Sequence, residues 1–93
     1  KNQVNRSGSL VLHPNPNSGL FFVEIETDSA EPGSIFLTDI TGRVVFSLPV
    51  ETRYGLNTFP VDVKQLAGGI YSVSFKSPSK FNFSSVQVVV QDK

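Results

Sequence analysis

Leu20–Glu26 has the sequence LFFVEIE, in which apolar residues alternate with glutamates towards the end. Successive side chains of an extended strand point to opposite faces, so Phe21, Val23 and Ile25 share one face and the glutamates share the other. An amphipathic helix would instead need apolar residues three and four positions apart. The segment therefore predicts a β-strand with one face against a core and the other in water.

Similar segments, rich in Val, Ile and Phe, recur along the chain between clusters of turn residues. The turn signals come at intervals of roughly 8–15 residues, which is typical of a β-sandwich or a small barrel. No segment shows a convincing helical period. About seven strands are expected, at Leu10–Leu12, Leu20–Glu26, Ile35–Thr41, Arg43–Leu48, Leu56–Val63, Ile70–Lys76 and Phe81–Gln91.

The strand predicted at Leu56–Val63 contains a proline. Its apolar side chains are expected to face the core, and its polar side chains, Asn57 among them, to face water. Pro60 has no N–H group to donate to a neighbouring strand. We therefore predict that this segment is an edge strand or carries a bulge at Pro60.

Three clusters of turn residues separate the strands. Asp39–Gly42 (DITG) is predicted to form a tight hairpin, in which Asp39 accepts hydrogen bonds from the backbone that follows and Gly42 adopts a positive φ. Gly68-Gly69 is expected to turn the chain in a similar way. Pro14–Gly19 (PNPNSG) is expected to be stiff and extended, and suited to carry the chain from one sheet to the other.

The composition allows one domain and excludes several kinds of site and partner. A chain of 93 residues can bury one modest core. Its 8 basic and 8 acidic residues form no run of like charge, which disfavours nucleic acid and anionic membranes as partners. There is no cysteine and no apolar run near the ~20 residues of a membrane-spanning helix. We expect a flexible polar linker at residues 1–9 and one β domain at residues 10–93.

The sequence shows no pattern that predicts a catalytic, cofactor-binding or metal site. His13 is the only histidine, and beside Pro14 it is expected at a strand end or in a loop. Glu24 and Glu26 are expected on a solvated outer face. Other carboxylates that could serve calcium are not concentrated in one run; they belong to Asp28, Glu31, Asp39 and Asp62.

Four features stand in order along the chain and together resemble a known family. They are His13–Pro16 followed by Gly19, the hairpin Leu37–Val45, the turn Leu66–Tyr71, and a final VQVVVQDK. This series resembles the C-terminal sorting domain (type A) of the type IX, or Por, secretion system of Bacteroidota. The resemblance covers roughly Leu10 to Lys93, with His13 at the position where family members usually have tyrosine.

The resemblance implies an immunoglobulin-like antiparallel β-sandwich that acts as a signal and not as an enzyme. Such a domain follows a larger cargo protein, and the type IX outer-membrane translocation machinery recognises it. A sortase-like peptidase would then cut in or just before the linker at residues 1–9 and join the cargo to surface lipopolysaccharide. The implied location is the periplasm in transit, and then the cell surface or the medium.

The resemblance also implies two sets of site residues. The translocation machinery would recognise the last strand through the translocon-recognition residues Val88, Val89, Val90, Gln91, Asp92 and Lys93. We hypothesise from the alternating valines that this strand pairs with its receptor by strand addition. The remaining family-motif residues have sufficient structural reasons in turns, caps or the core; they are Pro14, Asn15, Pro16, Gly19, Asp39, Gly42, Arg43, Gly69 and Tyr71.

An immunoglobulin-like accessory module that binds a glycan or a protein stays open as an alternative, because sandwiches host many functions. Tyr54, beside Gly55, is the best candidate for a sugar-binding aromatic residue. We expect instead that it caps the edge of the core from a loop. Position in the parent protein would separate the two functions, because a sorting domain ends its chain.

Overall fold

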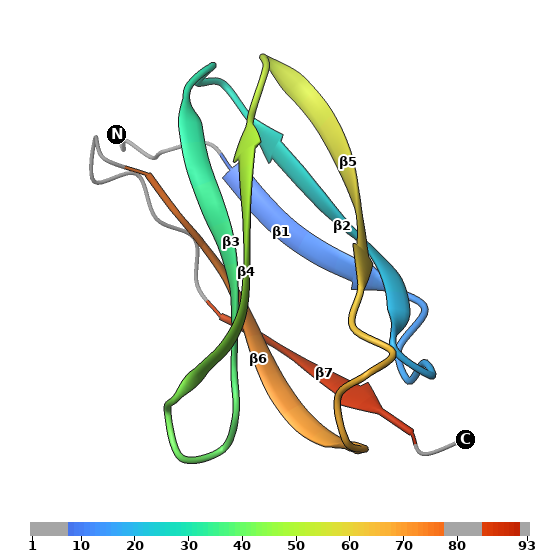
Figure 1. Cartoon of the computed structure of the whole chain (residues 1–93). Helices are drawn as coiled ribbons and strands as arrows, with labels where there is room; N and C mark the ends of the chain where they lie inside the picture. The colour runs from blue at the N-terminus through green and yellow to red at the C-terminus, as the bar shows by residue number, and fades with distance from the viewer. Residues whose placement is uncertain (1–7, 78–84, 92–93) are drawn as a thin grey trace, which may run out of the picture.

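The computed structural model describes residues 8–77 and 85–91, and within them it shows an antiparallel β-sandwich (Figure 1). One sheet has the strand order β1-β2-β5 and the other has the order β4-β3-β6-β7. The predicted all-β, immunoglobulin-like fold is confirmed. The strands are β1 (Gly8–His13), β2 (Leu20–Thr27), β3 (Pro32–Thr38), β4 (Val44–Glu51), β5 (Gly55–Asp62), β6 (Gly69–Lys76) and β7 (Val86–Val90).

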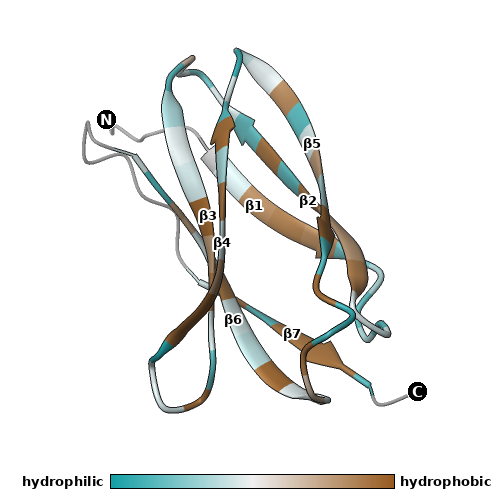
Figure 2. Ribbon diagram, in the orientation of Figure 1, coloured by the Kyte–Doolittle hydropathy of each residue, from teal (hydrophilic) through white to brown (hydrophobic). Residues whose placement is uncertain are grey.

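The core is formed by every second side chain of the strands. Phe21, Val23 and Ile25 of β2 are fully buried, as their spacing predicts. The outward positions hold the 39% exposed Phe22 and then glutamates, so that hydrophobic and hydrophilic bands alternate towards the end of β2 (Figure 2). The strands of the facing sheet contribute in the same way. The other buried apolar side chains are Leu10, Ile35, Leu37, Val61, Val63, Tyr71, Val73, Phe75, Val88 and Val90.

The three prolines within the described strands lie in edge strands or at the start of a strand. β5 is an edge strand, which confirms the prediction made from Pro60. β4 is the edge strand of the other sheet and contains Pro49, while Pro32 is the first residue of β3. These are the positions at which a missing N–H costs least.

Several strands begin or end at other residues than predicted. β3 begins at Pro32 and ends before the hairpin, and β4 continues past Leu48 to Glu51. β1 already includes Gly8 and Ser9, the last two residues of the predicted linker, whose first part lies outside the described residues. β7 is Val86–Val90, and residues 81–84 of the strand predicted there also lie outside the described part.

The structure corrects the predicted position of Asn57, which is 9% exposed and faces inward. Its Nδ2 donates to the carbonyl oxygens of Ile25, Arg53 and Gly55 at 3.1, 2.9 and 3.2 Å. Its Oδ1 accepts from the Arg53 N–H at 2.9 Å. Asn57 therefore holds the β4–β5 connection against β2. It lies two residues before Phe59 and four before Val61, so the alternation along β5 places all three on the same inward face.

Two predicted turns have other roles. Pro14–Gly19 connects β1 to β2 within one sheet, so the prediction that it carries the chain between sheets is wrong. The connection from β5 to β6 does cross between the sheets, and Gly68-Gly69 lies there instead of in a hairpin. Gly69 is the first residue of β6, and its φ is not positive.

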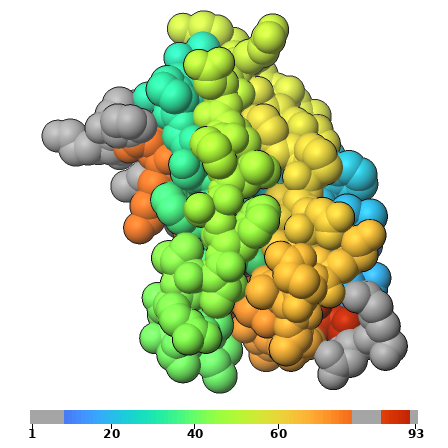
Figure 3. Space-filling model, in the orientation of Figure 1, coloured from blue at the N-terminus to red at the C-terminus, as the bar shows by residue number. Residues whose placement is uncertain are grey.

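β4 and β5 flank one side of the sandwich, which Figure 3 shows in green and yellow. Several of their apolar side chains are only half-buried there and pack against the core; they are Val45, Phe46, Leu48, Val50 and Phe59. No helix in the described ranges is long and apolar enough to cross a membrane.

Replacing Asn57 tests whether its amide holds the β4–β5 connection. Asn57→Ala should lower the free energy of unfolding by about 1–3 kcal/mol, because it removes hydrogen bonds to one buried and three part-buried backbone groups. Thr58→Ala, at the neighbouring exposed position of β5, should change it by less than about 0.5 kcal/mol. Chemical denaturation measures both variants, and equal effects would contradict the assigned role.

Candidate functional site

The last strand has one buried face and one exposed face. Val88 and Val90 are 0% and 3% exposed and belong to the core, whereas Val89 is 37% exposed. Gln87 and Gln91 are also exposed. Of the predicted recognition residues, Asp92 and Lys93 lie outside the described part of the chain.

β7 pairs with β6 on one side, so its other side is a sheet edge. Asn17 lies against this edge in a parallel bridge with Val90. The Asn17 N–H donates to the Val89 carbonyl oxygen at 3.0 Å, and the Gln91 N–H donates to the Asn17 carbonyl oxygen at 2.7 Å. Figure 1 shows the loop between β1 and β2 beside the end of β7.

The side-chain amide of Asn15 continues the same pairing. Its Nδ2 donates to the Gln87 carbonyl oxygen at 3.1 Å, and its Oδ1 accepts from the Val89 N–H at 2.9 Å. In a parallel ladder, the residue opposite Val88 would make these two contacts with its own backbone. The Asn15 amide therefore takes the place of a peptide group.

The residues between these contacts make a compact turn. Asn17 is 6% exposed; its Nδ2 donates to the Pro14 carbonyl oxygen at 2.9 Å, and its Oδ1 accepts from the Gly19 N–H at 2.8 Å. Pro14 and Pro16 have no N–H, so the segment offers few donors to a further strand. We call Pro14–Asn17 the edge cap.

Sequence reasoning missed Asn17, although it singled out the neighbouring Pro14, Asn15 and Pro16. The available signal was a second asparagine two residues after the first, because residues two apart in an extended segment face the same side. Gly69 of β6 pairs with Val90 from the opposite side. Val90 therefore lies between Gly69 and Asn17.

Gly19 fixes the end of this loop against the β5–β6 connection. Its carbonyl oxygen accepts from the Val63 N–H at 2.7 Å, and its φ is +107°. A Cβ at this position would lie 2.8 Å from the Lys64 Cα. Both the backbone conformation and the close approach require glycine here.

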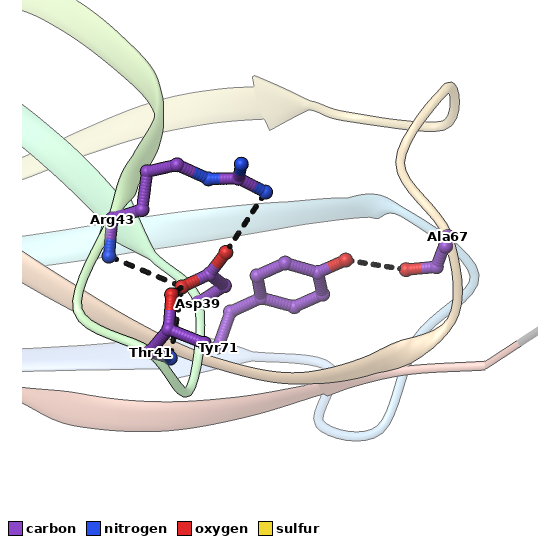
Figure 4. Close-up of polar contacts among 5 residues, drawn as sticks. All are labelled: Asp39, Thr41, Arg43, Ala67 and Tyr71. Carbon is purple, nitrogen blue, oxygen red and sulfur yellow. Dashed lines mark hydrogen bonds and ion pairs between the residues drawn. The ribbon is translucent and has the colours of Figure 1, made fainter.

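The hairpin between β3 and β4 has the predicted geometry (Figure 4). The Gly42 N–H donates to the Asp39 carbonyl oxygen at 2.9 Å, and Gly42 has a φ of +90°. Asp39 Oδ1 accepts from the Thr41 hydroxyl at 2.6 Å and from the N–H groups of Thr41 and Arg43 at 2.9 and 3.1 Å. This arrangement is that of a type I turn followed by a left-handed glycine.

The same contacts act on the Asp39 carboxyl. The hydrogen bond from the Thr41 side chain, followed by those from the Arg43 and Thr41 backbone, lowers the pKa of Asp39. Arg43 Nη2 lies 3.2 Å from Asp39 Oδ2, but the Arg43 side chain is 77% exposed. Such an exposed ion pair adds little stability.

Tyr71 joins β6 to the connection that precedes it. Its ring is buried, and its hydroxyl donates to the Ala67 carbonyl oxygen at 2.6 Å (Figure 4). Immunoglobulin-like domains have a tyrosine with this contact at the corresponding corner. The hydrogen bond fixes the crossing segment over the end of the sandwich.

The remaining candidates are His13, the scattered carboxylates and Tyr54. Across residues 8–77 and 85–91, no three His, Asp or Glu side chains gather as a metal site would require. His13 ends β1 as predicted, with its Nε2 3.0 Å from Glu24 Oε2. Tyr54 is 75% exposed and does not pack on the core, so the expectation that it caps the core edge is wrong.

Gly42 offers a test of the hairpin. A Cβ at Gly42 would meet nothing within 4 Å, so a substitution acts through the backbone alone. Gly42→Val should lower the free energy of unfolding by about 1 kcal/mol or more, since a β-branched residue resists positive φ. Gly42→Asn should cost less, because asparagine tolerates this region. Equal melting temperatures for the wild-type protein and Gly42→Val would contradict the assignment.

Comparison with solved structures shows the fold. The chain is similar to part of a β-glucosidase from Listeria innocua in complex with glucose, with a TM-score of 0.50, 20% identity, and coverage of 91% of this chain and 16% of that one. A mutant β-glucosidase from Listeria innocua in complex with laminaribiose gives a TM-score of 0.49 at 20% identity, covering 92% and 16%. The chain thus spans about a sixth of the length of these enzymes. No curated protein matches it.

A family model gives the identification. The model described as the secretion system C-terminal sorting domain matches residues 11–91, from β1 to the end of the described chain. This range contains the edge cap, the Asp39 hairpin, the Tyr71 corner and β7. The chain therefore belongs to the family of type IX secretion system C-terminal sorting domains.

Proposed function

We propose that the type IX machinery recognises the folded domain through its last strand, and that the domain carries a larger cargo through the periplasm and across the outer membrane. The family itself supports a sorting signal that is attached to cargo, contacts type IX machinery, and is exported to the cell surface or secreted. A sortase-like peptidase then cuts in or before the linker at residues 1–9, removes the domain at residues 10–93, and anchors the cargo. The domain catalyses no reaction itself.

One observation supports the role of the last strand most directly. β7 lies at a sheet edge and presents the exposed Val89 between two exposed glutamines, with no charged side chain in Val86–Gln91. Strand edges bind extended partners through main-chain hydrogen bonds, and alternate side chains supply specificity. The buried Val88 and Val90 fix the strand in position for this contact.

The direct test fuses the chain to the C-terminus of an exported fluorescent protein. The fusion should reach the surface of a type IX-competent bacterium and should stay inside a mutant that lacks the system. Deleting Val88–Lys93 should trap the cargo, but it also removes Val88 and Val90 from the core. Delivery in the mutant strain would contradict the sorting function and leave the accessory-module alternative.

A matched pair of exposed valines separates recognition from folding. Val89→Lys should lower delivery by about tenfold, which corresponds to ~1.4 kcal/mol of lost binding. Val44→Lys changes a valine of β4 that is 53% exposed and should leave delivery near the wild-type level. Surface fluorescence measures both variants. If they are delivered equally well, the machinery does not recognise the exposed face of β7.

A further inference from the structure

The four edge strands of the sandwich are protected in different ways. β4 and β5 contain Pro49 and Pro60, and neither residue has an N–H group to offer to a further strand. β1 lies beside β7, where the two sheets contact each other. β7 contains no proline, and the edge cap of the same chain covers its outer side.

We propose that the outer edge of β7 is a docking edge for an extended strand that runs parallel to β7, and that this strand displaces the edge cap. The proposal rests on the proposed function and names the contact through which the machinery binds. The edge cap then occupies the hydrogen-bonding positions of the partner strand until the partner binds.

The direction of the partner follows from the contacts of the cap. Asn17 bonds to Val89 and Gln91 with its backbone, in a parallel bridge. The Asn15 amide bonds to Gln87 and Val89 as the next backbone unit of a parallel strand would. A partner strand parallel to β7 can take over these four contacts without a change in register.

When the partner strand replaces the cap, the number of hydrogen bonds to β7 stays the same. A small difference in binding free energy in favour of the partner can therefore drive the replacement. The partner would replace a side-chain amide with backbone groups and could continue along the length of β7. Charged side chains are absent from Val86–Gln91, which favours an uncharged partner strand.

The hydrogen bonds between the cap and β7 should break at a lower free energy than those within the core strands. Pro14, Asn15 and Pro16 are exposed, and only Asn17 is buried. Hydrogen bonds of exposed loops open at a lower free energy than those of core strands. Until it opens, the cap keeps an uncharged, valine-rich edge from pairing with other chains, as protected edges do.

A disulfide between the cap and β7 tests the exchange. Pro16 and Val89 precede the bridged pair Asn17 and Val90, and neighbouring strands lie about 4.8 Å apart, within the ~4.4–6.8 Å that a disulfide spans. The chain has no native cysteine, so in a Pro16→Cys/Val89→Cys variant this is the one disulfide that can form within the domain. The variant is fused to the fluorescent cargo, and its oxidation is checked by mass spectrometry.

The oxidised variant should be delivered at least about tenfold less than the same variant kept reduced in a strain without periplasmic thiol oxidation. The two samples share every residue, and the wild-type fusion measured in both strains corrects for the difference between the strains, so that the remaining difference is due to the disulfide. Equal delivery of the two, at a level above that in the strain lacking the type IX system, would overturn the proposal, and failure of the pair to oxidise would contradict the placement of the cap beside β7. Failure of the unmodified fusion to be delivered would instead overturn the proposed function.

A second variant weakens the cap. In Asn15→Ala, the Val89 amide should exchange with deuterium at least about tenfold faster, while the amides of β3, which lies between β4 and β6, keep their protection. Delivery of this variant should be at or above the wild-type level, since the partner competes with a weaker cap. Lowered delivery with intact β3 protection would show that the machinery recognises the cap itself, and would overturn the exchange.

Discussion

The outer backbone groups of β7 need hydrogen-bond partners, and the rest of the structure depends on how the chain supplies them. An uncovered N–H or C=O beside the core weakens the strand and invites pairing with other chains. Here the partners come from the loop between β1 and β2, 72 and 74 residues away in the sequence for the two Asn15 contacts. The outer backbone groups of the last strand are therefore hydrogen-bonded only when the β1–β2 hairpin has folded.

This dependence connects several of the family-motif residues to β7. Gly69 and Asn17 lie on the two sides of Val90, and Gly19 fixes the cap loop against the segment that Tyr71 holds in place. The Asp39 hairpin closes a different connection and keeps β3 and β4 in register. The recognition signal that we propose for β7 is thus supported by turns spread along most of the described chain, so that it depends on a folded domain.

The sequence was sufficient for the features that depend on local pattern. The period of two residues predicted the faces of β2, Pro60 predicted an edge strand, and Asp39 with Gly42 predicted the hairpin. The order of the motifs predicted the family. Each of these depends on a few neighbouring residues, whose steric and hydrogen-bonding preferences hold whatever surrounds them.

The predictions that were wrong concerned positions that distant parts of the chain determine. Asn57 was assigned to water because it is polar, yet the open backbone groups of the β4–β5 connection make an inward amide favourable. Pro14–Gly19 was assigned to a crossing between sheets because prolines stiffen it, and nothing near it in the sequence indicated that β7 lies alongside. The role of Asn17 depends on that contact.

The most direct measurement of the central claim is the scalar coupling across the hydrogen bonds between the cap and the last strand. Magnetic resonance of the isotopically labelled protein should show coupling from the Gln91 amide nitrogen to the Asn17 carbonyl carbon, and from the Asn17 amide nitrogen to the Val89 carbonyl carbon. Both couplings are expected in the protein free of any partner. Their absence, with the couplings between β6 and β7 present, would contradict a capped last strand.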